Sequence, residues 1–139
     1  MKPSISEILE NASNIKNKQE KINFLRSQYS KSLLDVLVAC YDPNIEFLLP
    51  EGPTPYKPST QVESQGVLYA RTREFYIFIK GGNDNLKQMK REMLWVSLLE
   101  SIDPKDAALL NSVKDKKMPY KGINKKIISE AFPEVPNLK

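Results

Sequence analysis

The sequence contains no histidine and only one cysteine among its 139 residues. The absence of histidine removes the usual general base, the Ser-His and Cys-His catalytic pairs and most kinds of zinc site. Cys40 has no partner for an internal disulfide, and its place in the apolar run 33–41 predicts a buried thiol. We therefore expect a protein that is not an enzyme and that has no cofactor, no metal site and no small-molecule substrate.

The sequence also lacks any apolar run near the roughly 18 residues that a membrane span needs. Its first residues are polar and acidic where a signal peptide would be apolar. We expect no membrane contact, a cytoplasmic location and a mature protein that is the whole chain. The net charge of +4 favours an anionic partner, although a composition rich in lysine and asparagine is also typical of AT-rich genomes.

Helix-capping patterns and helical spacing of apolar residues recur along the chain. Ser4, Asn17 and Asp103 each precede a helical run and have an acidic residue three positions later, and Ser30 or Ser32 begins another run. Helices are expected over residues 5–12, 17–29, 33–40, 64–79 (capped by Ser64), 86–102, 103–113 and 124–132. These features predict one all-α domain over residues 1–139 with about seven or eight short helices, the helix 33–40 being central.

The sequence leaves alternative structures or roles open for two segments and for one residue, Trp95. Residues 75–79 fit a helix face or a strand, because aromatic and β-branched residues dominate them. Residues 50–61 contain four prolines and form a loop or arm, and their PxxP patterns belong to a plain linker or to a recognition ligand. Trp95 is a core or edge residue or a stacking platform. Residues 134–139 are expected to be a frayed tail.

The most distinctive stretch is a basic turn that leads into a short helix near the end of the sequence. Five lysines and no acidic residue lie between positions 116 and 126. Asn124 is a good N-cap, and Pro133 ends the helix at Phe132. The free N–H groups of a helix start among lysines make a phosphate site, and the alternative is a solvated lysine-rich turn.

The order of these segments resembles the N-terminal, all-helical DNA-binding domain of ATP-dependent DNA ligases of the tailed-phage type. The resemblance covers most of the chain, and its most specific part is residues 117–133, with Lys-Met-Pro-Tyr-Lys-Gly-Ile-Asn at its start. The sequence is also similar to small proteins of T-even-like phages that carry Arg-Glu-x-Leu and Pro-Tyr-Lys-Gly signatures. The resemblance implies a stand-alone module in the host cytoplasm that binds duplex DNA with little sequence specificity.

In the ligase family, two turns that contain lysine, glycine and asparagine lie on the sugar-phosphate backbone. The positions of this sequence that look similar, and that the resemblance implies as DNA-binding, are Lys80, Gly81, Gly82, Asn83, Lys87, Lys116, Lys117, Tyr120, Lys121, Gly122, Asn124, Lys125 and Lys126. We expect the two turns to act as paired clamps on duplex DNA. The sequence has no Lys-x-Asp-Gly motif to accept AMP and thus no nucleotidyltransferase centre.

A second hypothesis is a helical interaction module for a phage or host replication or transcription protein. The proline-rich segment 50–61 and the exposed face of the helix 86–102 would then carry the contact. Carboxylates such as Glu92, Glu100, Asp103 and Asp106 are explained by helix surfaces and caps, so they do not by themselves indicate catalysis.

Overall fold

Five of the described helices begin at polar residues that the sequence predicts as N-caps. A computed structural model describes residues 3–60 and 66–135, so the predicted cap Ser64, the loop end at Gln61 and residues 136–139 of the predicted frayed tail lie outside the described residues. Five N-cap side chains accept a hydrogen bond from a nearby main-chain N–H at 2.9–3.2 Å: Ser4, Asn17, Ser30, Asp103 and Asn124. Each bond satisfies a donor that the helix start leaves free.

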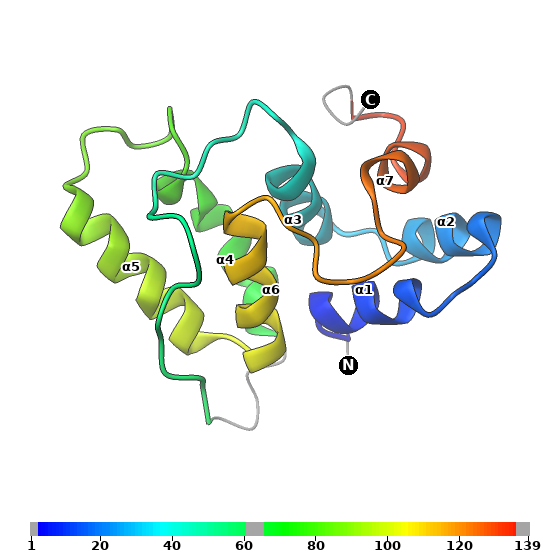
Figure 1. Cartoon of the computed structure of the whole chain (residues 1–139), viewed down its shortest axis with the longest axis horizontal. Helices are drawn as coiled ribbons and strands as arrows, with labels where there is room; N and C mark the ends of the chain where they lie inside the picture. The colour runs from blue at the N-terminus through cyan, green and yellow to red at the C-terminus, as the bar shows by residue number, and fades with distance from the viewer. Residues whose placement is uncertain (1–2, 61–65, 136–139) are drawn as a thin grey trace.

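The described residues form an all-α fold, as the sequence predicts (Figure 1). Its elements are α1 (Ile5–Ser13), α2 (Lys18–Ser27), α3 (Lys31–Tyr41), α4 (Val67–Arg71), the 3-10 helix η1 (Thr72–Phe78), α5 (Gln88–Ser101), α6 (Pro104–Lys114) and α7 (Lys125–Ala131). No helix in the described part of the chain is both long and apolar enough to cross a membrane.

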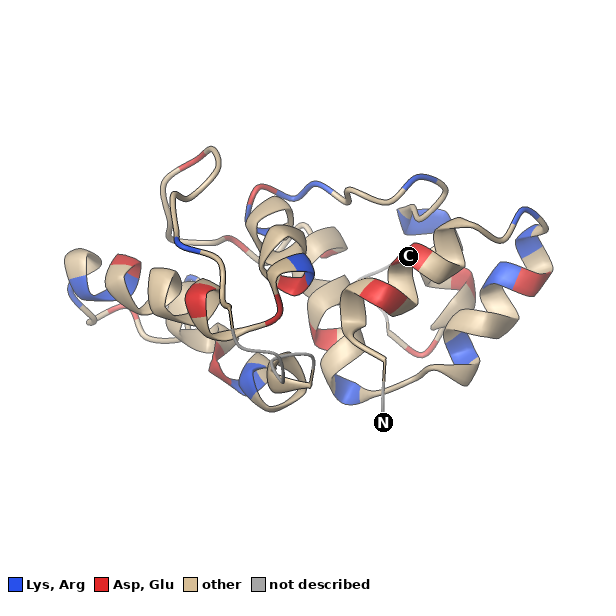
Figure 2. Cartoon of the chain, turned by 90° about the horizontal axis from the view of Figure 1, so that it is seen from below, with Lys and Arg blue, Asp and Glu red and all other residues tan. Residues whose placement is uncertain are grey.

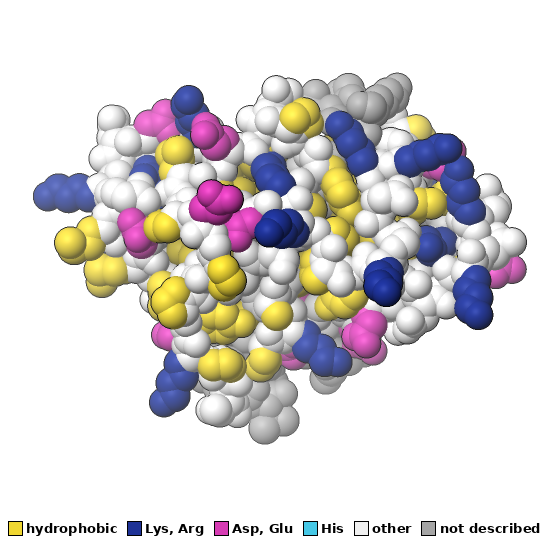
Figure 3. All heavy atoms as spheres, viewed as in Figure 1, with side chains coloured by type: hydrophobic (Ala, Val, Ile, Leu, Met, Phe, Trp, Pro, Cys, Tyr) yellow, Lys and Arg dark blue, Asp and Glu magenta, His cyan; other side chains and the backbone are white. Residues whose placement is uncertain are grey.

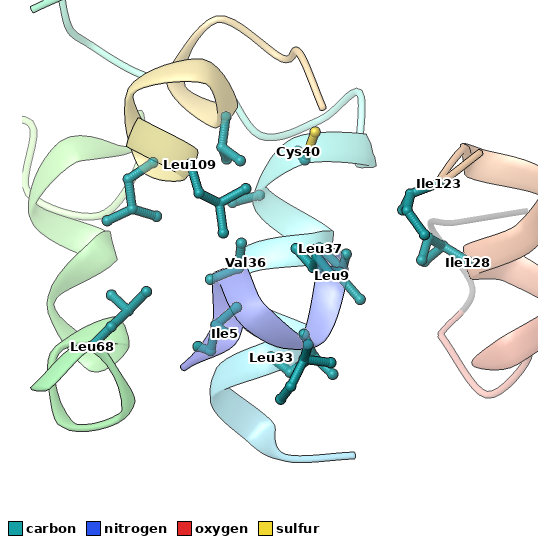
Figure 4. Packing of buried hydrophobic residues seen from close by; sticks show 14 of the residues in the cluster. Ile5, Leu9, Leu33, Val36, Leu37, Cys40, Leu68, Leu109, Ile123 and Ile128 are labelled. Carbon is teal, nitrogen blue, oxygen red and sulfur yellow. The ribbon is translucent and has the colours of Figure 1, made fainter. Parts of the chain in front are cut away.

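Helix α3 is the centre of the core, which confirms the prediction from its nearly continuous apolar run. Leu33, Val36 and Leu37 are fully buried, and Cys40 is almost so. Figure 4 shows α1 crossing α3, with α6 and α4 on one side and the start of α7 on the other. Burial raises the pKa of the Cys40 thiol to about 11, so the thiol is protonated at neutral pH.

The segment that fits either a helix face or a strand contains short pieces of both. After α4, the chain tightens into η1 and then extends at Ile79, which forms an isolated antiparallel bridge with Phe47. The N–H of Leu48 donates to the Phe78 carbonyl at 2.8 Å. Aromatic and β-branched residues disfavour a long regular helix here, and the bridge to the segment around Phe47 supplies the hydrogen bonds that a continued helix would have made.

The proline-rich segment is a fixed loop that runs along α5 and α6 (Figure 1). The N–H of Thr54 donates to Asn111 of α6 at 2.9 Å, and the N–H of Lys57 donates to Glu100 of α5 at 2.7 Å. Trp95 lies beneath the loop, 2% exposed, and its Nε1 donates to the Thr54 hydroxyl at 3.1 Å. The core interpretation of Trp95 is therefore confirmed, since a buried ring cannot serve as a stacking platform.

Candidate nucleic-acid interface

The first of the two turns predicted to bind DNA spans residues 80–87, and we call it the first corner. Acidic residues of the same chain bind its main chain and its Lys80 side chain. Gly81 has φ +92°, and its N–H donates to the Asp84 carboxylate at 2.7 Å. The N–H of Gly82 donates to a carbonyl of the preceding turn at 3.0 Å. Lys80 forms an ion pair with Glu46 at 3.7 Å. Both glycine N–H groups are thus occupied within the chain, which differs from the expectation that they face a phosphate.

A buried arginine that the sequence did not reveal holds this corner against the core. Arg91 of α5 is 3% exposed, and its guanidinium donates to the carbonyls of Ile77 (3.0 Å) and Asn83 (2.8 Å) and to Gln88 Oε1 (2.6 Å). The main-chain carbonyl of Asn83 is thus held by Arg91. Asn83 and Lys87 are nevertheless both exposed to solvent. The guanidinium group has five N–H donors, so one arginine can bind several carbonyl oxygens of the turn at once.

The second corner begins where α6 ends in a Schellman motif. Lys116 has φ +62°, the left-handed region that usually selects glycine. Its N–H donates to the Val113 carbonyl at 2.8 Å, and the N–H of Lys117 donates to the Ser112 carbonyl at 3.0 Å. These two bonds satisfy carbonyls that the helix end leaves free and turn the chain toward α1.

The side chain of Lys116 is used within the fold. Its Nζ donates to the carbonyls of Ala39 at 2.6 Å and Asp42 at 3.0 Å, at the carboxyl end of α3, and lies 5.8 Å from the centre of the Phe47 ring. A cation is favourable there, because the carboxyl end of a helix is the negative end of its dipole. Of the predicted DNA-binding lysines, Lys116 is the one whose ammonium group is engaged by main-chain carbonyls.

The turn around Gly122, with φ +78°, is fixed from its inner side. Three successive carbonyls accept hydrogen bonds from three helices or their ends: Lys121 from Ser13 Oγ (2.7 Å), Gly122 from Lys21 Nζ (3.1 Å) and Ile123 from the Tyr41 hydroxyl (2.9 Å). Because the carbonyls point inward, the lysine side chains of the turn are left on the outer side. Asn124 then caps α7 by accepting from the N–H of Ile127.

Four lysines follow one another along this outer side, and we call Lys117, Lys121, Lys125 and Lys126 the lysine strip. None of them has a carboxylate within 4.0 Å among the described residues. Figure 2 shows basic segments along the connection from α6 to α7 at one edge of the molecule. Figure 3 shows basic side chains outnumbering acidic ones over the end that holds α2 and α7. Lys117, Lys121 and Lys126 are exposed and Lys125 is half-buried, so the strip is a cationic surface with few acidic residues near it.

The two corners do not form one small cluster. Figure 1 places the turn before α5 and the turn before α7 toward opposite ends of the long axis. Lysines from the two corners do meet at one surface hollow of about 1040 Å³. Its charged lining includes Lys80, Lys116, Lys117, Glu46, Glu51 and Asp115. The paired-clamp arrangement expected from the sequence is thus replaced by a strip at one end and a mixed-charge hollow near the middle.

Tyr120 and Asp106 are not exposed as the strip lysines Lys117, Lys121 and Lys126 are. Tyr120 is half-buried, and burial raises the pKa of its phenol. Asp106 is fully buried, so its assignment to a helix surface or cap is corrected: Oδ1 accepts from the N–H of Ser6 in α1 at 2.9 Å, and Oδ2 has no partner among the described residues. No cluster of three or more His, Cys, Asp or Glu residues in the described ranges could hold a metal ion.

Two buried lysines, Lys114 and Lys21, support this surface, and neither is among the residues predicted from the sequence to have a role. Lys114 donates to the carbonyls of Pro50 (2.7 Å) and Gly52 (2.8 Å) and to Asp115 Oδ1 (2.8 Å), so it fixes the proline-rich loop. Lys21 is 8% exposed beneath Gly122. The spacing of Lys114, four residues after the buried Leu110, was the available signal for the first. No comparable signal marks Lys21, because its acceptor lies 101 positions away.

Comparison with known proteins gives one match. Residues 8–120 match the model of a family described as a family of unknown function, DUF6433. The matched range includes Lys117 and ends before Lys121, Lys125 and Lys126. No curated protein and no solved structure matches the chain.

Proposed function

The chain belongs to the DUF6433 family, and we propose that it is a non-catalytic module that holds duplex DNA by its backbone phosphates, with little sequence specificity. The observation that carries this proposal is the lysine strip, in which Lys117, Lys121 and Lys126 are exposed, Lys125 is half-buried, and none has an acidic partner among the described residues. Cations that neutralise phosphates release condensed counterions, and this gives non-specific dissociation constants of about 10⁻⁴ to 10⁻⁶ M at physiological salt.

The rigid inner side of the strip supports the proposal. Ser13, Lys21 and Tyr41 hold three successive carbonyls of the turn, so the main chain that carries Lys121 has a fixed path. A fixed path lowers the entropy that the protein loses when it binds an extended anion. The buried ammonium of Lys21 adds positive charge directly under the strip without being exposed itself.

The proposal differs from a pair of clamps at two equivalent glycine corners. At the first corner, Asp84 and Glu46 oppose an anion, since they accept from Gly81 and pair with Lys80. We therefore assign the main phosphate contact to the strip and give Lys80, Asn83 and Lys87 an outlying role on longer DNA. The resemblance to ligase DNA-binding domains supports a backbone contact of this kind, and on the same ground we propose that the module acts in the cytoplasm of a phage-infected host.

A mobility-shift titration with a 20-base-pair duplex in low salt tests the proposal. We expect the parent protein to retard the duplex and the double variant Lys121→Glu/Lys125→Glu to lose that retardation. The control is Lys31→Glu/Lys90→Glu, which changes the net charge equally at exposed lysines outside the strip, although Lys31 also loses its ion pair with Asp35. Absence of retardation by the parent, or equal losses in the two double variants, would show that the strip is not a DNA site.

One observation favours a second function, a helical interaction module for a replication or transcription protein. Met89 and Met93 of α5 are 77% and 59% exposed, and with Val96 they line an apolar groove. Exposed neighbouring apolar side chains are typical of protein contact sites. A partner retained by the parent after nuclease treatment, but lost with Met89→Gln/Met93→Gln, would favour this function over DNA binding.

A further inference from the structure

A large surface hollow lies where the lysine strip ends. It is bounded by the segment 43–56 and by residues 108–117 of α6 and the turn that follows it, and its volume is about 1040 Å³. Lys117 belongs both to the strip and to the lining of the hollow. An extended molecule that lies along the strip is therefore led to the mouth of the hollow.

The walls of the hollow offer aromatic surface. Phe47 and Tyr56 both line it, and both are only partly buried. Phe47 is supported from behind by Trp95, with ring centres 6.1 Å apart, and the Lys116 ammonium lies 5.8 Å from its ring centre. Bases stack on aromatic side chains of this kind whatever their identity. The Lys116 ammonium is already bound by the carbonyls of Ala39 and Asp42, so the phosphate contact has to come from another lysine of the hollow.

The charges in the hollow also suit a nucleotide. Two of its three carboxylates have cationic partners, Glu46 with Lys80 at 3.7 Å and Asp115 with the buried Lys114 at 2.8 Å. Glu51, at the loop, has no ion pair within 4.0 Å among the described residues, and a carboxylate there can accept from the exocyclic amino group of a base. Lys117, which also lines the hollow, has no carboxylate within 4.0 Å among the described residues and can face the phosphate.

We propose that the hollow receives an unpaired nucleotide at the end of a DNA duplex whose paired part lies on the lysine strip. Paired bases are stacked within the duplex and cannot enter a side pocket, whereas an unpaired base at an end is free to do so. The inference rests on the proposed function, and it adds a preference for tailed duplex ends to a contact that otherwise ignores sequence.

The test compares a blunt duplex with the same duplex carrying a three-nucleotide single-stranded tail that contains the fluorescent base 2-aminopurine. Anisotropy titrations in low salt should show at least about fivefold tighter binding of the tailed duplex, since stacking of one base contributes about 1–3 kcal/mol. The 2-aminopurine emission should be quenched when the tail stacks.

Two hollow variants and one control separate this inference from the proposed function. Ala108→Leu adds bulk to the hollow without adding a ring, and Phe47→Leu removes the aromatic face while keeping an apolar side chain. Both should remove the gain from the tail and leave the affinity for the blunt duplex unchanged. Ala70→Leu changes an exposed alanine of α4 outside the hollow. This variant should keep the gain in affinity from the tail and the affinity for the blunt duplex.

The outcomes distinguish the two claims. Equal affinities for blunt and tailed duplexes, or a tail gain that survives Ala108→Leu, would overturn the inference while leaving the strip as a DNA site. Failure of the parent protein to bind the blunt duplex would refute the proposed function. Even then, the hollow would be supported as a nucleotide site if the parent protein, but not the Ala108→Leu variant, quenches the emission of a free 2-aminopurine trinucleotide.

Discussion

The ammonium group of Lys21 lies under Gly122 and donates to its main-chain carbonyl oxygen at 3.1 Å, a contact between residues 101 positions apart in the sequence. It joins α2 to the turn that begins α7. A Cβ atom on residue 122 would lie 2.6 Å from this Nζ, which is closer than the two atoms can approach. The shape of the lysine strip thus depends on a glycine and on a buried lysine that never reaches its surface.

Replacement of Gly122 by alanine should therefore destabilise the protein. The positive φ of +78° and the clash with Lys21 together should lower the free energy of unfolding by about 2–3 kcal/mol, measured by urea denaturation. Gly52→Ala is the matched control, because Gly52 has φ +93° but open space around its Cβ position. A Gly52 variant as unstable as the Gly122 variant would show that the contact with Lys21 has no energetic weight.

At position 116, a glycine variant should be more stable than an alanine variant, which is the reverse of their usual order of stability. Its φ of +62° disfavours alanine, so Lys116→Ala should be less stable than Lys116→Gly by about 1 kcal/mol, although both lose the bonds to the Ala39 and Asp42 carbonyls. Thermal unfolding of the two variants side by side measures the difference. Equal stability would mean that residue 116 leaves the left-handed conformation once its side chain is removed.

Asp106 should make stability depend on pH in the direction opposite to most carboxyl groups. Burial raises its pKa from 3.8 to about 6, so the folded state favours the protonated acid. Its contribution to stability is complete below about pH 3.8 and is lost as the pH rises through about 6, by up to about 3 kcal/mol.

The test for Asp106 is the difference in unfolding free energy between the parent and Asp106→Asn. This difference should become less favourable to the parent between pH 4 and pH 7, because asparagine stays neutral throughout. A difference that does not change with pH would show that the Asp106 carboxyl has the same pKa in the folded and unfolded states.

Loss of Lys114 should release the proline-rich loop. Lys114→Met leaves Asp115 without its cation and frees the carbonyls of Pro50 and Gly52, which should cost about 3–5 kcal/mol. Hydrogen exchange should speed up at the amides of Gly52 and Thr54, both of which donate to α6 or its end. Lys105→Met, at an exposed pair with Glu10, is the control and should change stability by less than about 1 kcal/mol.

The parts of the fold that the sequence predicts correctly are those that depend on neighbouring residues. The caps at Ser4, Asn17 and Asn124 form hydrogen bonds three residues away, so the local pattern contains the whole interaction. The central position of α3 follows in the same way from its own apolar run.

The parts that the sequence does not reveal depend on distant acceptors. Lys21, Lys114 and Arg91 are buried because carbonyls from other segments receive their donors, and a single sequence shows those residues only as charges. The candidate site shows the same division: the exposed lysines around Gly122 follow from composition. The use of Lys116 to cap α3 and of Asp84 to close the turn at Gly81 requires the folded arrangement.

The most direct test of the lysine strip is the salt dependence of duplex binding. If each of the four lysines neutralises one phosphate, a plot of the logarithm of the association constant against the logarithm of salt concentration should have a slope of about −3.6. Lys121→Gln/Lys125→Gln should reduce the slope to about −1.8, whereas Lys31→Gln/Lys90→Gln should leave it near the parent value. A slope near zero, or one that both double variants change equally, would contradict the claim that duplex DNA lies along the strip.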